Sequence, residues 1–183
     1  CCDCCGGDGC RRSVACSWVP VLPTTQLDVS KREFPRLFDQ WLGDWGLKGA
    51  LRREGEIDGW QVYLYTKEPV VRSDSSWTTA YHGTWWYATW LLLETGALLE
   101  ACGPTLGHDF WGPGVYCTPA LDTALWYARP QIVFGDGVYY RVVLELRVDP
   151  TRQKRHRRRG GVQMVYATEG VAIHSVLVSA IQR

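Results

Sequence analysis

Hydrophobic residues recur along the chain with two spacings, and each spacing predicts a type of secondary structure. Helical intervals appear first, at Phe34, Leu37, Phe38, Trp41 and Leu42. Ser30 and Glu33 precede this run with the spacing of a capping box. Pro35 would fall in the first turn or so, where its missing N–H costs least. We therefore expect a helix from about residue 31 to residue 42.

Strand-like runs rich in β-branched, aromatic and aliphatic residues dominate the rest of the chain. We expect strands at residues 61–66, 77–81, 115–118, 138–148, 162–167 and 171–180. A helix capped by Thr84 should run to about Glu94 and close at Gly96, and another should cover residues 121–128. Strands outnumber helices, and the helices lie early. The pattern predicts an α+β fold with a mostly antiparallel, split β-sheet and a few flanking helices.

Composition supports a folded domain with a sizeable core. The chain has 183 residues, of which 46% are hydrophobic and 21% charged, and its net charge of +1 argues for no particular class of partner. Ten Trp and nine Tyr are a heavy aromatic load. Most should lie in the core, which leaves a minority to line a ligand site. The longest apolar run, around residues 85–93, is too short to cross a bilayer, so no membrane span is expected.

Cysteines are concentrated at the start of the chain. Six of the eight fall within the first sixteen residues, whereas a disulfide scaffold would spread them through the fold. Their spacing also lacks the paired pattern of a zinc ribbon. We expect residues 1–28 to be a disordered, Cys-rich segment, with metal binding and acylation as alternatives. The chain begins with Cys rather than Met, which suggests a fragment of a longer protein.

Three short motifs contain the candidate chemistry: Tyr-His-Gly-Thr at 81–84, Gly-Pro-Gly-Val-Tyr at 112–116 and Trp-Tyr-Ala at 126–128. Glycine lets a ligand approach the backbone closely, His82 offers a hydrogen-bonding tip, and Tyr116 and Tyr127 offer ring faces for stacking. This combination suits a flat aromatic ligand. No His or Cys spacing typical of a metal site accompanies it.

The order and spacing of these motifs resemble the catalytic domain of the ADP-ribosyltransferases of the poly-ADP-ribose polymerase type, which use NAD as substrate. The resemblance covers residues 60–183 and leaves residues 29–59 as an N-terminal helical extension. It implies that His82 holds the 2′-hydroxyl of the nicotinamide ribose and that Gly83 binds the carboxamide through its backbone. Tyr116 and Tyr127 would stack the ring. The small hydroxyl residue that the family commonly places three before the second Tyr is here Ala124.

In that family a third site decides the activity. In the polymerising members, a Glu is the first residue of a strand near the end of the domain. The matching position here is Val162, with Gln163 as its neighbour. Gln163 is a candidate ribose contact, and Glu169 is the candidate substitute for the catalytic carboxylate. Because Glu is missing at residue 162, we expect no polymerisation; transfer of a single ADP-ribose and binding without turnover both remain open.

The acceptor is expected to be a protein or a nucleic acid. A basic run at 152–159 precedes the presumed catalytic strand and is either a solvated loop or a patch that attracts a phosphate-rich acceptor. The sequence thus predicts an intracellular, cytoplasmic or nuclear mono-ADP-ribosyltransferase that needs no metal. The alternatives are an inactive module that binds NAD, ADP-ribose or a protein, and an enzyme similar to the tRNA 2′-phosphotransferases.

Overall fold

A computed structural model of the chain describes residues 28–68, 71, 73–100, 113–157 and 163–181. The helices are α1 (Asp28–Asp44), α2 (Trp86–Thr95) and α3 (Leu121–Ala124). The strands are β1 (Leu51–Ile57), β2 (Trp60–Tyr65), β3 (Thr78–Thr84), β4 (Val115–Cys117), β5 (Gln131–Ile132), β6 (Tyr139–Val148), β7 (Gln153–Arg157), β8 (Gln163–Tyr166) and β9 (Val171–Ile181). Short 3-10 helices, η2 (Pro150–Arg152) and η3 (Thr168–Gly170), precede β7 and β9.

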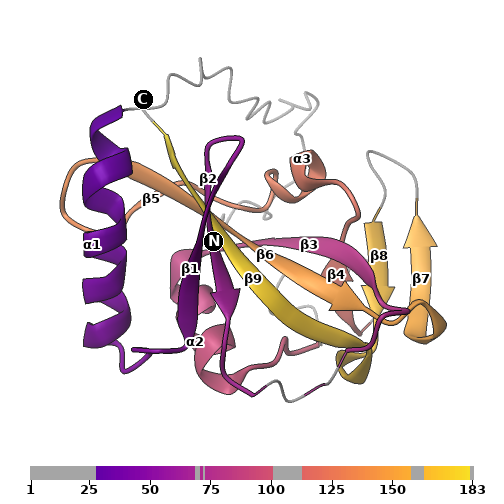
Figure 1. Ribbon diagram of the computed structural model, residues 1–183. Coiled ribbons are helices and arrows are strands. Elements are labelled where there is room, and N and C mark those ends of the chain that lie inside the picture. Colours follow the sequence, from indigo (N-terminus) through magenta and orange to yellow (C-terminus); the bar gives the residue numbers. More distant parts are fainter. Residues whose placement is uncertain (1–27, 69–70, 72, 101–112, 158–162, 182–183) are drawn as a thin grey trace, which may run out of the picture.

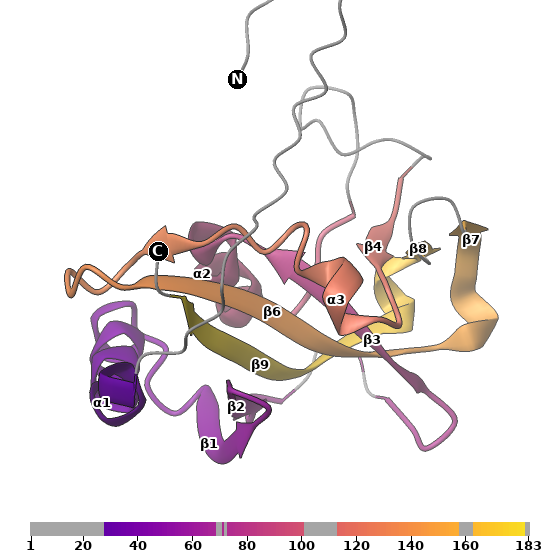
Figure 2. The same cartoon turned by 90° about the horizontal axis from the view of Figure 1, so that it is seen from above.

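The strands form two sheets whose pairs are antiparallel, which confirms the predicted α+β class with mostly antiparallel sheets. The larger sheet has the order β1-β2-β9-β6-β3, and β5 also pairs with β6 (Figure 1). The smaller sheet has the order β4-β8-β7. A single bridge between Tyr81 and Thr118 joins β3 to the end of β4. Figures 1 and 2 show α1 and the smaller sheet at opposite ends of the larger one.

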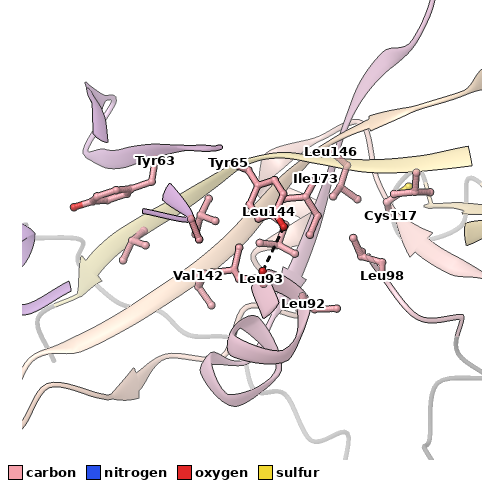
Figure 3. Packing of buried hydrophobic residues seen from close by; sticks show 14 of the residues in the cluster. Tyr63, Tyr65, Leu92, Leu93, Leu98, Cys117, Val142, Leu144, Leu146 and Ile173 are labelled. Carbon is pink, nitrogen blue, oxygen red and sulfur yellow. Dashed lines mark hydrogen bonds between the residues drawn. The ribbon is translucent and has the colours of Figure 1, made fainter. Parts of the chain in front are cut away.

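The main core lies on one face of the larger sheet. Side chains from α1 and α2 pack there against alternate residues of β6, namely Val142, Leu144 and Leu146, all fully buried. Figure 3 shows the packing of α2 residues against this face, and the Tyr65 hydroxyl there donates a 3.4 Å hydrogen bond to the carbonyl of Leu93 in α2. The intervening residue, Val143, faces the other way. It packs with Ala124 and Ala128, so the α3 segment covers the opposite face.

Aromatic rings attach α1 to the sheet. Phe38 is fully buried; its ring stacks on Trp41 at 5.7 Å and meets Tyr63 edge-on at 4.6 Å and Trp86 edge-on at 5.9 Å. Such pairs add to the free energy that each ring gains by leaving water. The helical spacing of the apolar residues of α1 is thus explained by one aromatic cluster, which ties the N-terminal helix to the core of the larger sheet.

Several boundaries differ from the predicted ones for identifiable reasons. Thr84 does not cap α2 but ends β3, and Trp85 occupies the N-cap position; the αL conformation of Gly96 (φ 69°) closes the helix as predicted. The predicted helix 121–128 stops at Ala124, and the chain continues in hydrogen-bonded turns. Part of the predicted basic loop is a strand, β7. Residues 1–27, the predicted Cys-rich segment apart from its last residue, lie outside the described residues.

Strand β1 has no counterpart among the predicted elements, and it pairs with β2 through a bulge between Arg53 and Gly55. The strand contains four charged residues and is mostly exposed, so the hydrophobic alternation that identifies a strand is absent. The hairpin joins residues 51–57, which fall in the predicted helical extension, to the same sheet as residues 60–65.

We expect Phe38→Ala to lower the free energy of unfolding by about 3–5 kcal/mol, because it removes a buried ring at the centre of the aromatic cluster. Urea unfolding followed by circular dichroism measures this loss. Trp126→Ala is the matched control, since Trp126 is 79% exposed and should change stability by no more than about 0.5 kcal/mol. Equal effects of the two substitutions would show that α1 is not docked through this cluster.

Candidate functional site

The candidate site lies where β3 separates from β4. Tyr81 exchanges both backbone hydrogen bonds with Thr118, at 2.7 and 2.9 Å, and within the described ranges this is the only backbone pairing between the two strands. Continuing the antiparallel register past the bridge places Gly83 opposite Tyr116. The two strands therefore diverge at the predicted His-Gly and Gly-x-Gly-Val-Tyr motifs.

His82 lies inside β3, opposite Leu144 of β6, and not at a strand end as the sequence suggested. Its half-buried imidazole is attached to the neighbouring strand, with Nδ1 2.7 Å from the carbonyl oxygen of Tyr116. A carbonyl oxygen only accepts hydrogen bonds, so Nδ1 must be the protonated nitrogen. In the neutral ring Nε2 is consequently the acceptor. The contact thus fixes the position of the ring and its tautomer together.

Gly83 presents its backbone to the split between the strands. Tyr81 directs its N–H and C=O away from β6 toward Thr118, and residues two apart in a strand point their backbone groups the same way. The N–H and C=O of Gly83 therefore face the side where Tyr116 lies. A planar amide could exchange a pair of hydrogen bonds with them, which is the chemistry that the resemblance assigns to this position.

Gly83 is also required by packing. A Cβ at this position would lie 1.9 Å from the carbonyl oxygen of Ala124 and 2.8 Å from the backbone nitrogen of Ala128. The two alanines are about 1% exposed, and their small side chains allow the α3 segment to approach β3. Position 124, where the transferase family commonly has a hydroxyl residue, is thus an alanine at the point where the backbone of the α3 segment meets the backbone of β3. Small residues four apart, at positions 124 and 128, are the sequence signal for this contact.

Gly114 has a similar packing role beside the second motif. A Cβ there would lie 2.3 Å from Cγ1 of Val165 and 2.9 Å from the carbonyl oxygen of Tyr166. The close approach brings the start of β4 onto β8 and so sets the position of Tyr116, two residues farther along the chain. Gly112 lies outside the described residues.

The two candidate stacking residues lie on different elements beside β3. Tyr116 is half-buried in β4, between the buried Val115 and Cys117. Tyr127 does not lie two turns into a helix, as the sequence predicts, but follows the end of α3 in a turn and is 46% exposed. The structure brings His82 to Tyr116 by a direct contact and brings the segment of Tyr127 to Gly83 through the adjacent Ala128.

Gln163 begins β8, at the end of that strand level with the bridge between β3 and β4. Met164 pairs with Cys117, so the register extended by one residue places the backbone of Gln163 opposite Thr118, the residue that bridges to β3. Val162, the position matched to the family's Glu, lies outside the described residues.

Glu169 lies at the other end of β3. It belongs to η3, and the carbonyl of Gly170 in η3 accepts a hydrogen bond from the backbone N–H of Asp149. Asp149 directly follows Val148, the last residue of β6, which pairs with Thr78, the first residue of β3. His82 is four residues farther along β3, about 13 Å. The side chain of Glu169 is 62% exposed and accepts a 3.2 Å hydrogen bond from Nη1 of Arg152. The register of β3 and the contact with Arg152 therefore place Glu169 in a surface ion pair, away from the imidazole of His82.

Another carboxylate, Glu145, lies opposite Tyr81 on β6. Its Oε2 accepts a hydrogen bond from the hydroxyl of Ser175, and its side chain lies on the α3 face. His82 alternates to the other face of β3, so Glu145 does not replace the missing carboxylate.

The surroundings of β4 are apolar enough to disfavour ionisation. Burial raises the pKa of the Cys117 thiol to about 12, and burial also raises the pKa of the Tyr166 hydroxyl to about 12. Desolvation, followed by the charge of Glu145, raises the pKa of Tyr81. These groups stay neutral at physiological pH. Hydrogen bonds made beside them are stronger than they would be in water.

The basic run that follows β6 is divided between a strand and residues outside the described ranges. Its first part forms β7, an edge strand of the smaller sheet. Lys154 donates a 2.7 Å hydrogen bond to Glu100, a contact that lowers the pKa of this carboxyl group. Arg152, the first residue of the run, pairs with Asp149 and Glu169, so at least two positive charges of the run are already compensated. Residues 158–162 lie outside the described part of the chain.

Within the described residues, no group of three or more His, Cys, Asp or Glu side chains could hold a metal ion. Over the same residues no helix is both long enough and apolar enough to cross a membrane. A scan against protein-family models finds no match for the sequence, and no curated protein matches it. The geometry of the chain itself is therefore the basis for any functional proposal.

Substitution of Gly83 tests the close approach of α3. We expect Gly83→Ala to destabilise the fold by about 1–3 kcal/mol, because the new methyl group would overlap backbone atoms. Gly43→Ala is the matched control: no atom lies within 4 Å of its Cβ position, and in α1 alanine should stabilise by up to about 1 kcal/mol. Thermal unfolding measures both. If Gly83→Ala unfolds at the temperature of the unmodified protein, the α3 segment does not approach β3 this closely.

Proposed function

We propose that this chain binds NAD where β3 separates from β4 and transfers a single ADP-ribose to a macromolecular acceptor. The observation that supports this most strongly is the contact between Nδ1 of His82 and the carbonyl of Tyr116, beside the backbone of Gly83 that faces the split. A fixed imidazole and a backbone amide pair are what a ribose hydroxyl and a carboxamide need for simultaneous hydrogen bonding. The motifs that resemble the NAD-using transferases thus meet in one region.

Each residue has a distinct part in this proposal. Nε2 of His82 accepts the hydrogen of a ribose hydroxyl, and the N–H and C=O of Gly83 bind the carboxamide. Tyr116 and Tyr127 supply ring faces for the nicotinamide, and a pyridinium ring gains cation–π energy there. Breaking the bond between nicotinamide and ribose leaves an oxocarbenium-like sugar, while nicotinamide departs as a neutral molecule. The acceptor nucleophile then forms the new bond to the anomeric carbon and loses its proton.

Binding of NAD without transfer is the second candidate, and the position of Glu169 favours it. A carboxylate that stabilises the developing positive charge must lie beside the ribose, whereas Glu169 is held at the other end of β3 by Arg152. Gln163 is a polar residue whose backbone position lies next in register to the bridge at Thr118. It could contact the ribose but could not supply a full negative charge.

The acceptor is proposed to be a protein or nucleic acid that the basic residues around β7 attract. Besides the compensated Lys154, this edge strand contains Arg155 and Arg157, and it continues the smaller sheet beyond β8. Cationic side chains beside a transferase site would raise the local concentration of a phosphate-rich acceptor, an effect that salt would weaken.

His82→Ala should weaken NAD binding by about tenfold or more, because a positioned hydrogen bond is lost within a partly desolvated site. Isothermal titration calorimetry with NAD measures the dissociation constant. His174→Ala is the control, since this half-buried histidine lies on β9, away from the split. An unchanged constant for His82→Ala, or no binding by the unmodified domain, contradicts the proposal.

Glu169→Gln separates the two candidates. Because Glu169 pairs with Arg152 on the surface, the substitution should leave both NAD affinity and any transfer of label from NAD within about twofold of the unmodified protein. Transfer that Glu169→Gln abolishes would contradict the surface position of this carboxylate and make Glu169 a catalytic residue. NAD binding with no transfer in any variant would leave the binding module as the function.

A further inference from the structure

Arg141 occupies an unusual place on the edge of β6. The pairing of β3 with β6 ends at Thr84, opposite Val142, and β5 takes up the same edge at Gln131, opposite Tyr140. Arg141 falls between these two pairings, and neither strand has a residue opposite it. The strand pairing along this edge is therefore interrupted at Arg141.

The side chain of Arg141 lies on the face of the sheet covered by α3. Residues two apart in a strand share a face, and Val143 packs with Ala124 and Ala128 on that side. Ser179 of β9 is the cross-strand neighbour of Arg141. Arg141 is half-buried as a residue, so part of its surface remains accessible.

No anion in the described residues compensates this guanidinium. Its Nε atom is fully buried and has no hydrogen-bond partner, and no carboxylate of the described chain forms an ion pair with the side chain. The next carboxylate along this face, Glu145, accepts a hydrogen bond from Ser175. Burial lowers the pKa of Arg141, but an arginine stays charged at neutral pH. Partial burial of an unpaired cation is costly, and a bound anion would offset that cost.

A second guanidinium lies against Trp85, the residue that follows β3. Arg129 lies two residues before the start of β5, and its Cζ sits 4.4 Å from the ring centroid of Trp85. Trp85 directly follows the last paired residue of β3 in an extended conformation, so the register extended by one residue places it beside Arg141. Trp85 therefore links Arg129 to the half-buried Arg141 at the gap between β3 and β5.

We propose that Arg141 and Arg129 form a binding site for a phosphate group on the α3 face, at the gap between β3 and β5. Guanidinium groups match the oxygens of phosphate geometrically, and a pair of them balances the charge of a phosphate dianion. The phosphate could belong to a dinucleotide bound at Gly83, two residues along β3 from Trp85, or to a separate phosphorylated acceptor. The two arginines would bind the phosphate group in either case, so the proposal does not depend on NAD binding.

A titration with inorganic phosphate and pyrophosphate, followed by backbone amide resonances at constant ionic strength, tests the site. We expect saturable shifts at residues 85, 129 and 141. Arg141→Gln and Arg129→Gln should each weaken pyrophosphate binding by about tenfold or more, because each removes charge-assisted hydrogen bonds. Arg147→Gln is the matched control and should stay within about twofold. Arg147 lies on the same strand, where it donates to the hydroxyl of Thr79.

The Arg129 variant keeps the test decisive if Arg141→Gln fails to fold. The proposal is overturned if the unmodified protein shows no saturable shift, or if pyrophosphate binds Arg129→Gln as it binds the unmodified protein. A stability loss in Arg141→Gln without a loss of affinity also overturns it, since the arginine would then be only a packing residue. Competition between pyrophosphate and NAD would identify the dinucleotide as the source. Simultaneous binding would identify an acceptor phosphate, and either result supports the site.

Discussion

The outer edge of β3 is the constraint on which the candidate site depends. One residue of that edge, Tyr81, is paired to Thr118, and two residues later the backbone of the α3 segment comes so close that only glycine fits. These contacts hold β4 and α3 on either side of Gly83. The imidazole of His82 then joins β3 to β4 a second time through the carbonyl of Tyr116. The site is therefore fixed by backbone packing before any ligand binds.

Packing and proposed chemistry use the same residues at this edge. Gly83 is required by the approach of Ala124, and it is also the residue whose backbone groups face the split. Gly114 is required by the approach of β8, and it also precedes the aromatic candidate Tyr116. A glycine-rich motif is therefore compatible with a purely structural role.

The sequence predicted the elements that have a strong hydrophobic signal and missed those that lack one. Helix α1 buries one apolar face, and the long strands β6 and β9 bury most of their residues; the two strands lie within one residue of their predicted bounds. Helix α1 begins three residues before its predicted start, so Pro35 lies inside the helix and not in its first turn. Strand β1 is charged and exposed, so its pairing with β2 left no periodic trace. The convergence of His82, Gly83 and Tyr116 was predicted, whereas the distance of Glu169 from them depends on strand register, which local patterns do not specify.

The protonation of His82 is the most direct measurement of the central claim that the imidazole is fixed for ligand binding. Long-range proton–nitrogen NMR correlations distinguish the two ring nitrogens. We expect a proton on Nδ1, which donates to the carbonyl of Tyr116, and a change at Nε2 when NAD is added. A ring with its proton on Nε2 alone, or one whose nitrogens do not respond to NAD, would contradict this claim.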